Sequence, residues 1–369
     1  MAVLVLNPGS TTLKAAVVLA DGSVRSHQSR ETWDLGQAAR EILGLLDSDV
    51  TAIGCRVVHG GQYFTEPTRV TPEVIDRIRE LGDLAPLHNY GAAAVLRTCA
   101  ELAPSLPVVA VFDTAYHTTL PPMARTYGIP YQLAETEGLY RYGFQGTVHQ
   151  ANVTAVALAL EKDQRPNRRI ISVHLGGGCS LCAALDGRSM DTTMGVTPLE
   201  GVMMATRSGD IDPGMLFHLM RKGWTPERVE KMLNQESGLR GVSGVSDDPR
   251  ALFAAADTGN ARAALAIDLY CYRIAKSIAA YTVPLGGVDG IAFSGGIGQH
   301  SGRIRQQVCD QLTHLGVGLD HQINGATDNP ITPTGLHRSE SSVGVYAVPA
   351  NEEVIIAKIT DGLLHTGSQ

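Results

Sequence analysis

Charged residues are scarce in this chain, and positive charge is the scarcer sign. Asp, Glu, Lys and Arg make up 18 % of the 369 residues, against roughly 25 % in ordinary domains. The 30 Lys and Arg face 37 Asp and Glu, which leaves a formal net charge of −7. Because there is no basic excess to displace phosphate counterions, we expect no nucleic-acid partner.

Long apolar runs and a signal sequence are also lacking. No stretch reaches the ~18 consecutive apolar residues of a membrane helix, so we expect no membrane partner. The opening residues 1–6 carry no basic segment and run directly into a motif, which argues against a secretory signal peptide. Six cysteines in so long a chain do not make a disulfide framework. Together these absences predict a cytoplasmic protein.

The commonest motifs of nucleotide-binding proteins, metalloproteases and hydrolases are missing. The chain has no G-x-x-x-x-G-K-[ST], H-E-x-x-H or G-x-S-x-G, and Gly296-Ile297-Gly298 lacks the third glycine of a dinucleotide-binding fingerprint. Cys179 and Cys182 have the spacing of a redox pair, but they lie inside an apolar run typical of a strand. We therefore favour buried packing over a redox or metal role for these thiols.

Glycine, by contrast, is abundant and gathers beside apolar strands. The 40 glycines are about 11 % of the chain, against a usual ~7 %. Residues 2–6 and 13–19 predict a hairpin whose tip is rich in Gly, Ser and Thr, and residues 170–175 and 181–185 predict a second around Gly176–Gly178. Because the two hairpins lie about half a chain apart, they indicate an internal duplication. A third glycine turn, residues 293–298, precedes a helix expected to begin near Ser301.

Helical periodicity fills the segments between these turns. Residues 92–102, 150–161 and 262–282 have apolar side chains at spacings of three and four, whereas residues 324–342 have little periodicity and are expected to be loop. Strands that alternate with helices predict the α/β class. The length of the chain predicts two domains.

Some polar groups stand out as candidates for binding phosphate or metal. The first hairpin tip offers backbone N–H groups and hydroxyls, with Lys14 just beyond, although a tip alone is more simply a tight turn. Arg56 lies in an apolar run and Arg207 in a polar loop, where a guanidinium needs a carboxylate or phosphate partner. Asp113 follows the apolar strand 108–112, where it is either a Mg²⁺ ligand or a helix N-cap.

Taken in order along the chain, a set of motifs resembles the acetokinase family of the actin-like ATPase superfamily. The motifs are residues 6–14, 56–61, 112–117, 141–144, 191–201, 206–214, 241–246 and 351–353. The opening Asn-Pro-Gly-Ser-Thr is closer to the related butyrate kinases, whereas the block from Met194 to Gly214 is closer to acetate kinases. The resemblance covers nearly the whole chain.

The resemblance implies a fold and a reaction. The fold would be α/β, with two ribonuclease-H-like domains around a nucleotide cleft, in a homodimer. Residues 1–117 with 354–369 would form one domain, and residues 118–353 the other. The reaction would be reversible transfer of the γ-phosphoryl group of ATP to acetate with Mg²⁺ or Mn²⁺, giving acetyl phosphate and ADP in organic acid metabolism. Such a transfer depends on positioning and on cations around the spreading negative charge.

The resemblance also implies roles for individual residues. The catalytic positions are Arg56, Asp113, Arg207, Gln145 and His149, of which the two arginines hold the carboxylate and the transferring phosphoryl group. The metal is assigned to Asn7 and Glu352, beside Asp113. The nucleotide is assigned to Asn7, Ser10, Thr12, Lys14, His174, Gly176, Gly177, Gly178, Asp248, Arg250 and Gly296. A small apolar pocket for the acyl methyl group is assigned to Val58, Leu87, Phe144 and Pro198.

Several positions depart from the family pattern. Gln145 stands where the family has a catalytic histidine, and His149 would partly compensate if both side chains share a helical face. Gly177 and Gln299-His300 also depart from the pattern, in loops expected to face the nucleotide. One alternative is therefore a kinase of the same fold that uses propionate, butyrate or another small carboxylate as acceptor, or pyrophosphate as donor. Another is a catalytically weak binding protein, although such a protein has no need of buried unpaired charges.

Overall fold

The computed structural model describes residues 2–9, 11–86, 88–349 and 351–366, and its chain divides into two compact units. Unit 1 comprises the residues up to 118, residues 128–148 and those from 351 onward; unit 2 comprises residues 119–127 and the segment that begins at 149. The sequence-based division assigned all of 118–353 to one domain. In the structure, residues 128–148 belong by their contacts to unit 1.

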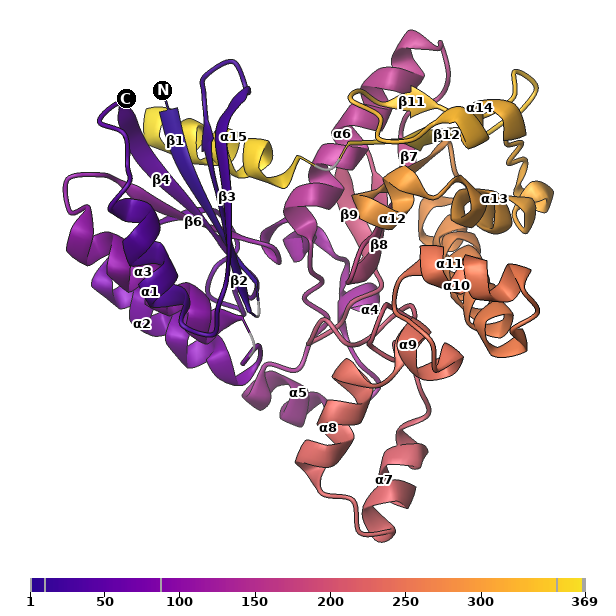
Figure 1. Cartoon of the computed structure of the whole chain (residues 1–369), viewed down its shortest axis with the longest axis horizontal. Coiled ribbons are helices and arrows are strands. Elements are labelled where there is room, and N and C mark those ends of the chain that lie inside the picture. Colours follow the sequence, from indigo (N-terminus) through magenta and orange to yellow (C-terminus); the bar gives the residue numbers. More distant parts are fainter. Residues whose placement is uncertain (1, 10, 87, 350, 367–369) are drawn as a thin grey trace. The chain divides into compact units, whose positions relative to one another are not determined.

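A mixed six-stranded sheet forms the centre of unit 1 (Figure 1). Its strand order is β3-β2-β1-β4-β6-β5. The bounds are β1 (Ala2–Pro8), β2 (Thr12–Val18), β3 (Val24–Glu31), β4 (Val50–Val57), β5 (Thr68–Arg69) and β6 (Val108–Phe112). β1, β2 and β3 are antiparallel neighbours, which confirms the first predicted hairpin, while β4 and β6 run parallel to β1. The short β5 pairs antiparallel with β6 at the edge.

Both faces of this sheet are covered by helices, as the alternation along β1 requires. Leu4 and Leu6 belong to the cluster shared with α1 (Leu35–Leu43) and α3 (Asn89–Leu102), to which α2 (Pro72–Glu80) adds two isoleucines. Val3 and Val5 point to the other face, where they join the cluster that includes α15 (Glu352–Thr366). Successive side chains of a strand point to opposite faces, so a strand buried on both faces is apolar throughout.

The sheet of unit 2 repeats the same strand order, β9-β8-β7-β10-β12-β11. Its bounds are β7 (Arg169–Leu175), β8 (Cys179–Leu185), β9 (Arg188–Thr192), β10 (Gly290–Ser294), β11 (Thr334–Gly335) and β12 (Gly344–Ala347). Again three antiparallel strands are followed by two parallel strands and a two-residue antiparallel edge strand. The chain is therefore α/β with two ribonuclease-H-like units, and the duplication expected from the two hairpins extends to the whole sheet.

The helices confirm the predicted periodic segments. Residues 92–102 lie in α3, 150–161 in α6 (Gly146–Lys162) and 262–282 in α11 (Ala261–Leu285). The remaining α-helices are α4 (Pro122–Arg125), α5 (Tyr131–Glu137), α7 (Pro213–Arg221), α8 (Pro226–Gln235), α9 (Gly238–Ser243), α10 (Pro249–Asp257), α12 (Gly295–His300), α13 (Gly302–Asp310) and α14 (His321–Ala326). Within the described residues, 3₁₀ turns span Leu81–Asp83, Ala115–Thr119 and Thr313–Leu315. None of the helices described combines the length and apolar character needed to cross a membrane.

Two details differ from the sequence-based expectation. The third glycine turn is in fact the short helix α12, because Ser294 ends β10 and Gly295 begins a helical turn with a φ of +77°. The segment 324–342 is mostly loop, but it includes the end of α14 and the strand β11. Six-residue helices rich in glycine and two-residue strands are too short to leave a periodic pattern in the sequence.

Cys179 and Cys182 lie in β8 as free, fully buried thiols. Sγ of Cys179 lies 3.1 Å from Oη of Tyr270, and Sγ of Cys182 lies 3.4 Å from Oγ of Ser189. Burial raises the pKa of Cys179 to about 11 and that of Cys182 to about 12. Since a redox-active cysteine needs a thiolate, these values agree with the packing interpretation.

Candidate active site

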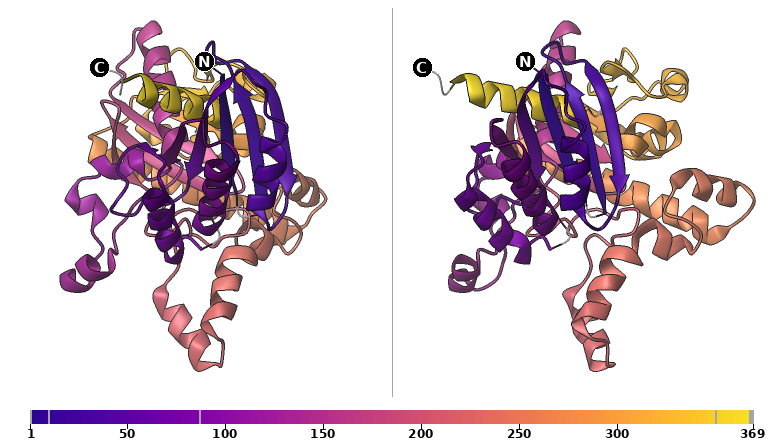
Figure 2. Two further views of the ribbon diagram at one scale, coloured as in Figure 1. Left: turned by 90° about the vertical axis from the view of Figure 1, so that its left-hand side faces the viewer. Right: turned by 60° about the vertical axis from the view of Figure 1, so that its left-hand side comes forward.

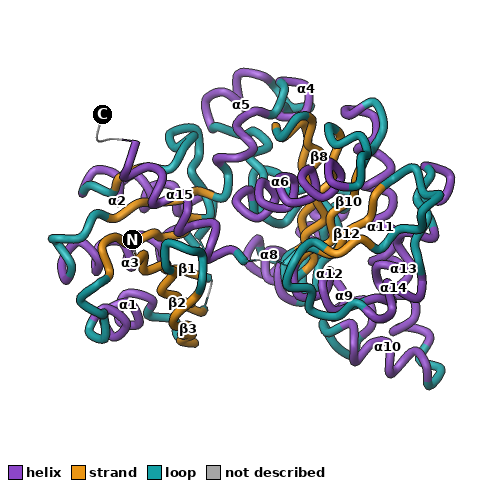
Figure 3. Tube along the Cα trace, turned by 90° about the horizontal axis from the view of Figure 1, so that it is seen from above, coloured by secondary structure: helices purple, strands orange, loops and turns teal. Residues whose placement is uncertain are grey.

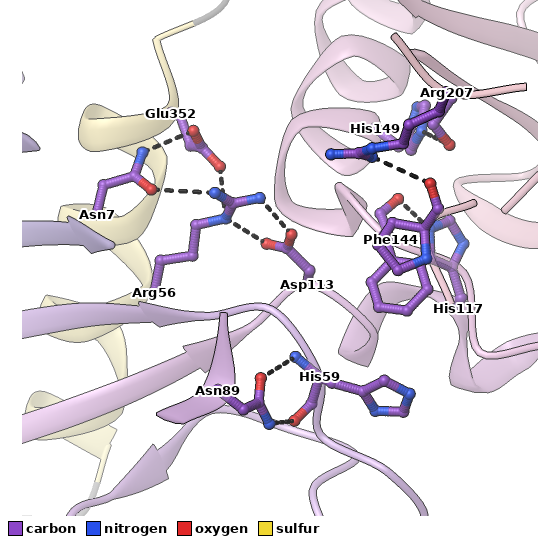
Figure 4. Close-up of polar contacts among 12 residues, drawn as sticks. Asn7, Arg56, His59, Asn89, Asp113, His117, Phe144, His149, Arg207 and Glu352 are labelled. Atoms are coloured by element: carbon purple, nitrogen blue, oxygen red, sulfur yellow. Dashed lines mark hydrogen bonds and ion pairs between the residues drawn. The ribbon is translucent and has the colours of Figure 1, made fainter. Parts of the chain in front are cut away.

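Four polar side chains converge at one edge of the unit 1 sheet (Figure 4). Asn7, Arg56 and Asp113 lie at the carboxyl ends of the parallel strands β1, β4 and β6, or directly after them. The fourth, Glu352, is the first residue of α15. Because parallel strands end at the same edge of a sheet, residues far apart in the sequence meet here.

Arg56 is the centre of this polar cluster. Its Nε and Nη2 donate to the two carboxylate oxygens of Asp113 at 2.9 and 2.6 Å. Nη1 donates to Oδ1 of Asn7 at 3.1 Å, and Nε lies 3.0 Å from Oε1 of Glu352. Nδ2 of Asn7 donates to the other carboxylate oxygen of Glu352 at 2.8 Å. The guanidinium therefore holds both acids in one network, with a formal charge of −1 over the three ionisable groups.

Burial dominates the electrostatics of the cluster. Asp113 is 0 % exposed, and burial raises the pKa of its carboxyl while the Arg56 guanidinium opposes that rise. Burial alone would lower the pKa of Arg56, but the carboxylates of Asp113 and Glu352 raise it overall. Bidentate contact at these distances favours the ionised form of both partners.

The carboxylate of Asp113 pairs with Arg56, while its backbone carbonyl accepts from N–H of Gly146 at 2.9 Å. A Cβ on Gly146 would lie 2.3 Å from that carbonyl oxygen, so only glycine allows α6 to begin so close to the end of β6. This places the start of α6 beside the polar cluster. The role of Asp113 as a Mg²⁺ ligand stays a prediction.

The predicted phosphate hairpin lies in the same unit. Asn7 and Lys14 are cross-strand partners in β1 and β2, and the N–H of Gly9 donates to the Thr12 carbonyl at 2.7 Å across the tip. The side chain of Lys14 is exposed and Thr12 is half-buried. Ser10 lies outside the described residues. The hairpin thus carries its polar groups at the same sheet edge as Arg56.

Unit 2 contains a pocket of about 450 Å³. Five of the residues assigned to the nucleotide line it: Gly176, Gly177, Asp248, Arg250 and Gly296. The other lining residues are Ala205, Asp247, Pro249, Ile297, His300 and Ser301, which the sequence reasoning did not assign although most flank the assigned ones. The volume lies within the range of small-molecule sites, roughly 300–1,000 Å³.

Two glycines that line this pocket expose their backbone because they have no side chain. A Cβ at Gly177, in the β7–β8 turn, or at Gly296, in α12, would have no neighbouring atom within 4 Å, so both glycines present bare backbone. Gly295, in contrast, has a φ of +77°, and a Cβ there would lie 2.5 Å from the carbonyl oxygen of Leu175. Gly295 thus brings α12 against the end of β7, where Nδ1 of His174 lies 3.0 Å from Oγ of Ser294.

Asp248 and Arg250 form the polar wall of the pocket. Oδ1 of Asp248 caps α10 by accepting from N–H of Arg250 at 2.9 Å. The Arg250 side chain hydrogen-bonds the same carboxylate and lowers the pKa of Asp248. In the glycine turn between β7 and β8, the N–H of Gly176 donates to the carbonyl of Gly178 at 3.1 Å.

The model of the Acetokinase family matches residues 34–358. The chain belongs to the acetokinase family.

Relatives and solved structures of the acetokinase family cover nearly the whole chain. It is 38 % identical to an acetate kinase of Halothermothrix orenii, with 98 % of each chain covered, and 40 % identical to acetate kinase 2 of Vibrio parahaemolyticus, with 98 and 99 % covered. The crystal structure of an acetate kinase from Porphyromonas gingivalis superposes with a TM-score of 0.89 at 34 % identity. A propionate kinase from Francisella tularensis has the same TM-score at 33 % identity, and both structures cover 98 % of this chain and 99 % of their own.

Gln145, where the acetokinase resemblance predicts histidine, has an unusual backbone. Its φ is +58°, a conformation that non-glycine residues rarely adopt and that clusters at functional sites. Its Oε1 and the Oγ1 of Thr147 are buried without a hydrogen-bond partner among the described residues. A hydrogen bond from the Gln145 backbone lowers the pKa of Asp113, so this residue lies beside the polar cluster.

The expectation that Gln145 and His149 share a helical face is wrong. α6 begins at Gly146, and the left-handed backbone of Gln145 places it outside the helix. His149 is fully buried in unit 2, with Nδ1 2.8 Å from Oγ of Ser172 and Nε2 3.0 Å from Oγ of Ser180. Its imidazole links β7 to β8, a position suited to support of the sheet.

The four residues of the predicted acyl pocket are divided in the structure. Val58 and Phe144 are buried in unit 1, Pro198 is half-buried in unit 2, and Leu87 lies outside the described residues. The carbonyl of Pro198 accepts from Nη1 of Arg207 at 3.0 Å, which ties these two assigned residues together. The pocket of four residues stays a prediction.

Sequence reasoning missed three polar residues, His59, Asn89 and His117, that position Phe144 or one another in unit 1. The ring of His59 lies edge-on to Phe144 with ring centroids 5.3 Å apart, and the Asn89 amide bonds both the N–H and the carbonyl of His59 (Figure 4). Nε2 of His117 lies 3.1 Å from the Phe144 carbonyl oxygen, and burial lowers the pKa of His117 to about 4. His59 and His117 lie within assigned motifs, but nothing in their spacing reveals these contacts.

Proposed function

We propose that this chain catalyses the reversible transfer of the γ-phosphoryl group of ATP to acetate, giving acetyl phosphate and ADP. The polar cluster of Asn7, Arg56, Asp113 and Glu352 is the observation that carries the proposal. A carboxylate and a polyphosphate repel one another, so their reaction requires cations that are fixed in advance. Arg56 is such a cation, because Asp113 and Glu352 hold its position.

Arg207 is the second cation in this proposal. It lies half-buried in the loop that follows β9, and the carbonyl of Pro198 orients one of its Nη atoms. Two arginines would hold the carboxylate and the transferring phosphoryl group, and each would lower the barrier by facing charge that develops in the transfer. The unpartnered Oε1 of Gln145 would face the reacting groups as an amide.

The chemistry of the polar cluster fits a divalent cation. Mg²⁺ and Mn²⁺ prefer oxygen ligands, and Mg²⁺ is usually held by one or two carboxylates together with substrate phosphates and waters. Asn7, Asp113 and Glu352 offer such oxygens in a cluster of net negative charge. Bound there, the ion would neutralise phosphate charge. Among the described residues, no group of three or more His, Cys, Asp and Glu side chains is placed to hold a metal by itself.

The nucleotide would bind in the pocket of unit 2. Its bare glycine backbone at Gly177 and Gly296 suits phosphate or ribose contacts, and Asp248 and Arg250 offer polar groups for the adenosine. The volume of about 450 Å³ is adequate for a nucleoside.

A same-fold kinase with another acceptor or donor is the second candidate. The similarity to a propionate kinase is compatible with a slightly larger acceptor, and the departures at Gly177 and Gln145 leave room for a different donor such as pyrophosphate. One extra methylene in an apolar pocket changes binding by only ~1–3 kcal/mol, so preference among short acids should be graded.

A hydroxamate assay over acetate, propionate and butyrate, each with ATP and with pyrophosphate, tests these candidates. We expect acetate with ATP to give the highest kcat/KM, propionate to be accepted and butyrate to be poor. Butyrate reacting faster than acetate would overturn the acceptor assignment, and turnover with pyrophosphate alone would overturn the donor. Nucleotide binding without turnover of any pair would identify a binding protein.

The assembly we propose is a homodimer that works in the cytoplasm. None of the residues of α7 is buried, although Met215, Phe217 and Met220 are apolar, and α7 projects from unit 2 with α8 (Figure 2). An apolar helix left uncovered is typical of a protein–protein contact. Light scattering should give the mass of a dimer for the wild type, and Phe217→Glu should yield monomers if α7 forms the contact.

A further inference from the structure

One of the side chains that unit 2 buries completely is a cation. Arg305 of α13 has an exposed fraction of 0 %. Burial lowers the pKa of Arg305 to about 10, so the guanidinium stays protonated near neutral pH. A buried charge is costly to fold around unless it is fully hydrogen-bonded. The proposed reaction makes no use of Arg305, so its burial calls for another explanation.

All five N–H donors of Arg305 are used, each on a neutral acceptor. Nε donates to Oδ1 of Asn324 at 2.7 Å. Nη1 donates to the carbonyls of Gly298 and Gln299 at 2.8 and 2.6 Å. Nη2 donates to the carbonyls of Asn324 and Thr327 at 2.9 and 2.8 Å. Only a planar guanidinium supplies five donors in this fixed arrangement.

These acceptors belong to two segments that border the pocket. Gly298 and Gln299 lie in the last turn of α12, where carbonyls have no partner within the helix and attract a cation. The same short helix carries the pocket residues Gly296, Ile297 and His300. Arg305 therefore binds the last turn of a helix that lines the pocket.

The second segment runs from the end of α14 into the following loop. α13 packs against both α12 and α14, as Figure 3 shows from above. Nδ2 of Asn324 donates to the carbonyl of Gly302, the first residue of α13. In the loop after α14, Oδ1 of Asp328 lies 2.5 Å from Nδ1 of the pocket residue His300. The side chain of Arg305 thus links α12, which lines the pocket, to the end of α14, and does not line the pocket itself.

We propose that Arg305 is a positioning residue that sets the nucleotide affinity of the unit 2 pocket without touching the nucleotide. The inference rests on the proposed function, in which this pocket takes ATP or ADP. Without the guanidinium, four main-chain carbonyls lose buried donors, and the segments must move to reach other partners. Because α12 is only six residues long, movement at Gln299 displaces Gly296 as well.

Calorimetric titration with ADP and Mg²⁺, together with steady-state kinetics, tests the proposal. Arg305→Lys keeps the charge but cannot reach all five acceptors, and Arg305→Met removes the charge. We expect each to raise the Kd for ADP and the KM for ATP at least tenfold, while the KM for acetate stays within twofold. A role confined to general stability would lower the melting temperature without this split between the two substrates.

The matched control is Arg338→Met, which also removes a guanidinium from unit 2. Arg338 is 52 % exposed and pairs with Glu340 in a loop that does not line the pocket, so this variant should keep the wild-type Kd. If the Arg305 variants do not fold, Asn324→Ala decides, because it removes the Nε acceptor and keeps the other four. A threefold or greater rise in the Kd for ADP would support the proposal.

The failures of the two hypotheses can be told apart. Wild-type protein that binds no ADP would contradict the proposed function, whatever Arg305 does. Wild-type protein that binds ADP, with folded Arg305 variants of equal Kd, would overturn the positioning role alone. Equal changes in the KM for ATP and acetate would overturn it too.

Discussion

Arg56→Ala is the most informative perturbation of the polar cluster. The change removes the bidentate partner of Asp113, a carboxylate that is 0 % exposed. Breaking a buried ion pair by removing one partner costs about 3–5 kcal/mol, because the other charge stays buried and uncompensated. The amide oxygen of Asn7 and the carboxylate of Glu352 lose a donor at the same time. We expect the free energy of unfolding at pH 8 to fall by about that amount.

The loss of unfolding free energy in Arg56→Ala should depend on pH. The direction of this dependence follows from the pKa of Asp113. Burial raises the pKa of Asp113, and removal of the Arg56 guanidinium leaves that rise unopposed. The folded variant then holds a proton at pH values where the unfolded chain, with a pKa of about 3.9, does not. Its free energy of unfolding therefore falls as the pH rises above about 4 and recovers as the pH is lowered.

Urea unfolding at pH 5 and pH 8 measures this difference. The deficit of Arg56→Ala relative to the wild type should be smaller at pH 5, and Arg56→Ala combined with Asp113→Asn should remove most of it at both pH values. The control Arg25→Ala breaks an exposed pair with Asp49 and should change little. A deficit that is absent at pH 8, or that does not shrink at pH 5, would refute the reasoning.

Activity separates the stability of the cluster from its chemistry. The double variant should stay at least 10²-fold below the wild type in turnover although its stability recovers, because loss of one preorganised donor costs ~3 kcal/mol in the transition state. Near-normal turnover would remove Arg56 from the mechanism.

Three further predictions concern the remaining assigned and missed residues. Arg207→Ala should lower turnover at least 10²-fold while circular dichroism stays unchanged, and normal turnover would remove it from the proposed site. Gln145→His should raise kcat roughly ten- to thirtyfold and add a pH dependence near 6.5, because a charge-assisted hydrogen bond replaces a neutral one. A lower kcat of this variant with acetate and ATP would favour another phosphoryl donor or acceptor. Burial holds His117 neutral with a pKa of about 4, so wild-type stability should fall by up to about 3 kcal/mol as the pH drops from 6.5 to 4. His117→Asn should remove that slope in unfolding experiments and the exposed His365→Asn should not; an unchanged slope in His117→Asn would contradict the assignment.

Local patterns in the sequence were sufficient for much of the fold. The hairpins around residues 7–12 and 176–178 were predicted because apolar strands and glycine-rich turns leave a short-range signal. The helix α11 was predicted because its apolar spacing extends over many turns. The helix α12 was missed because six residues with three glycines carry no such period.

In the candidate site, too, some residues could be predicted from the sequence and others could not. Arg56, Asp113 and the glycine loops could be singled out by residue type and neighbours, since a charge in an apolar run demands a partner. Their partners could not, because Asn7 bonds Glu352 across 345 positions of sequence. Likewise the left-handed φ of Gln145 leaves no signal in the sequence, and the five acceptors of Arg305 belong to segments that are close only in the folded chain.

The sequence by itself determined the two glycine-turn hairpins, the long periodic helices, the α/β class, the duplication and the residue types available for chemistry. Only the tertiary structure decided which groups form ion pairs, which have shifted pKa values and which line the same pocket. The physical reason is range: propensity and periodicity act over a few neighbouring residues, whereas burial, pairing and pKa depend on which distant segments lie at the same strand ends.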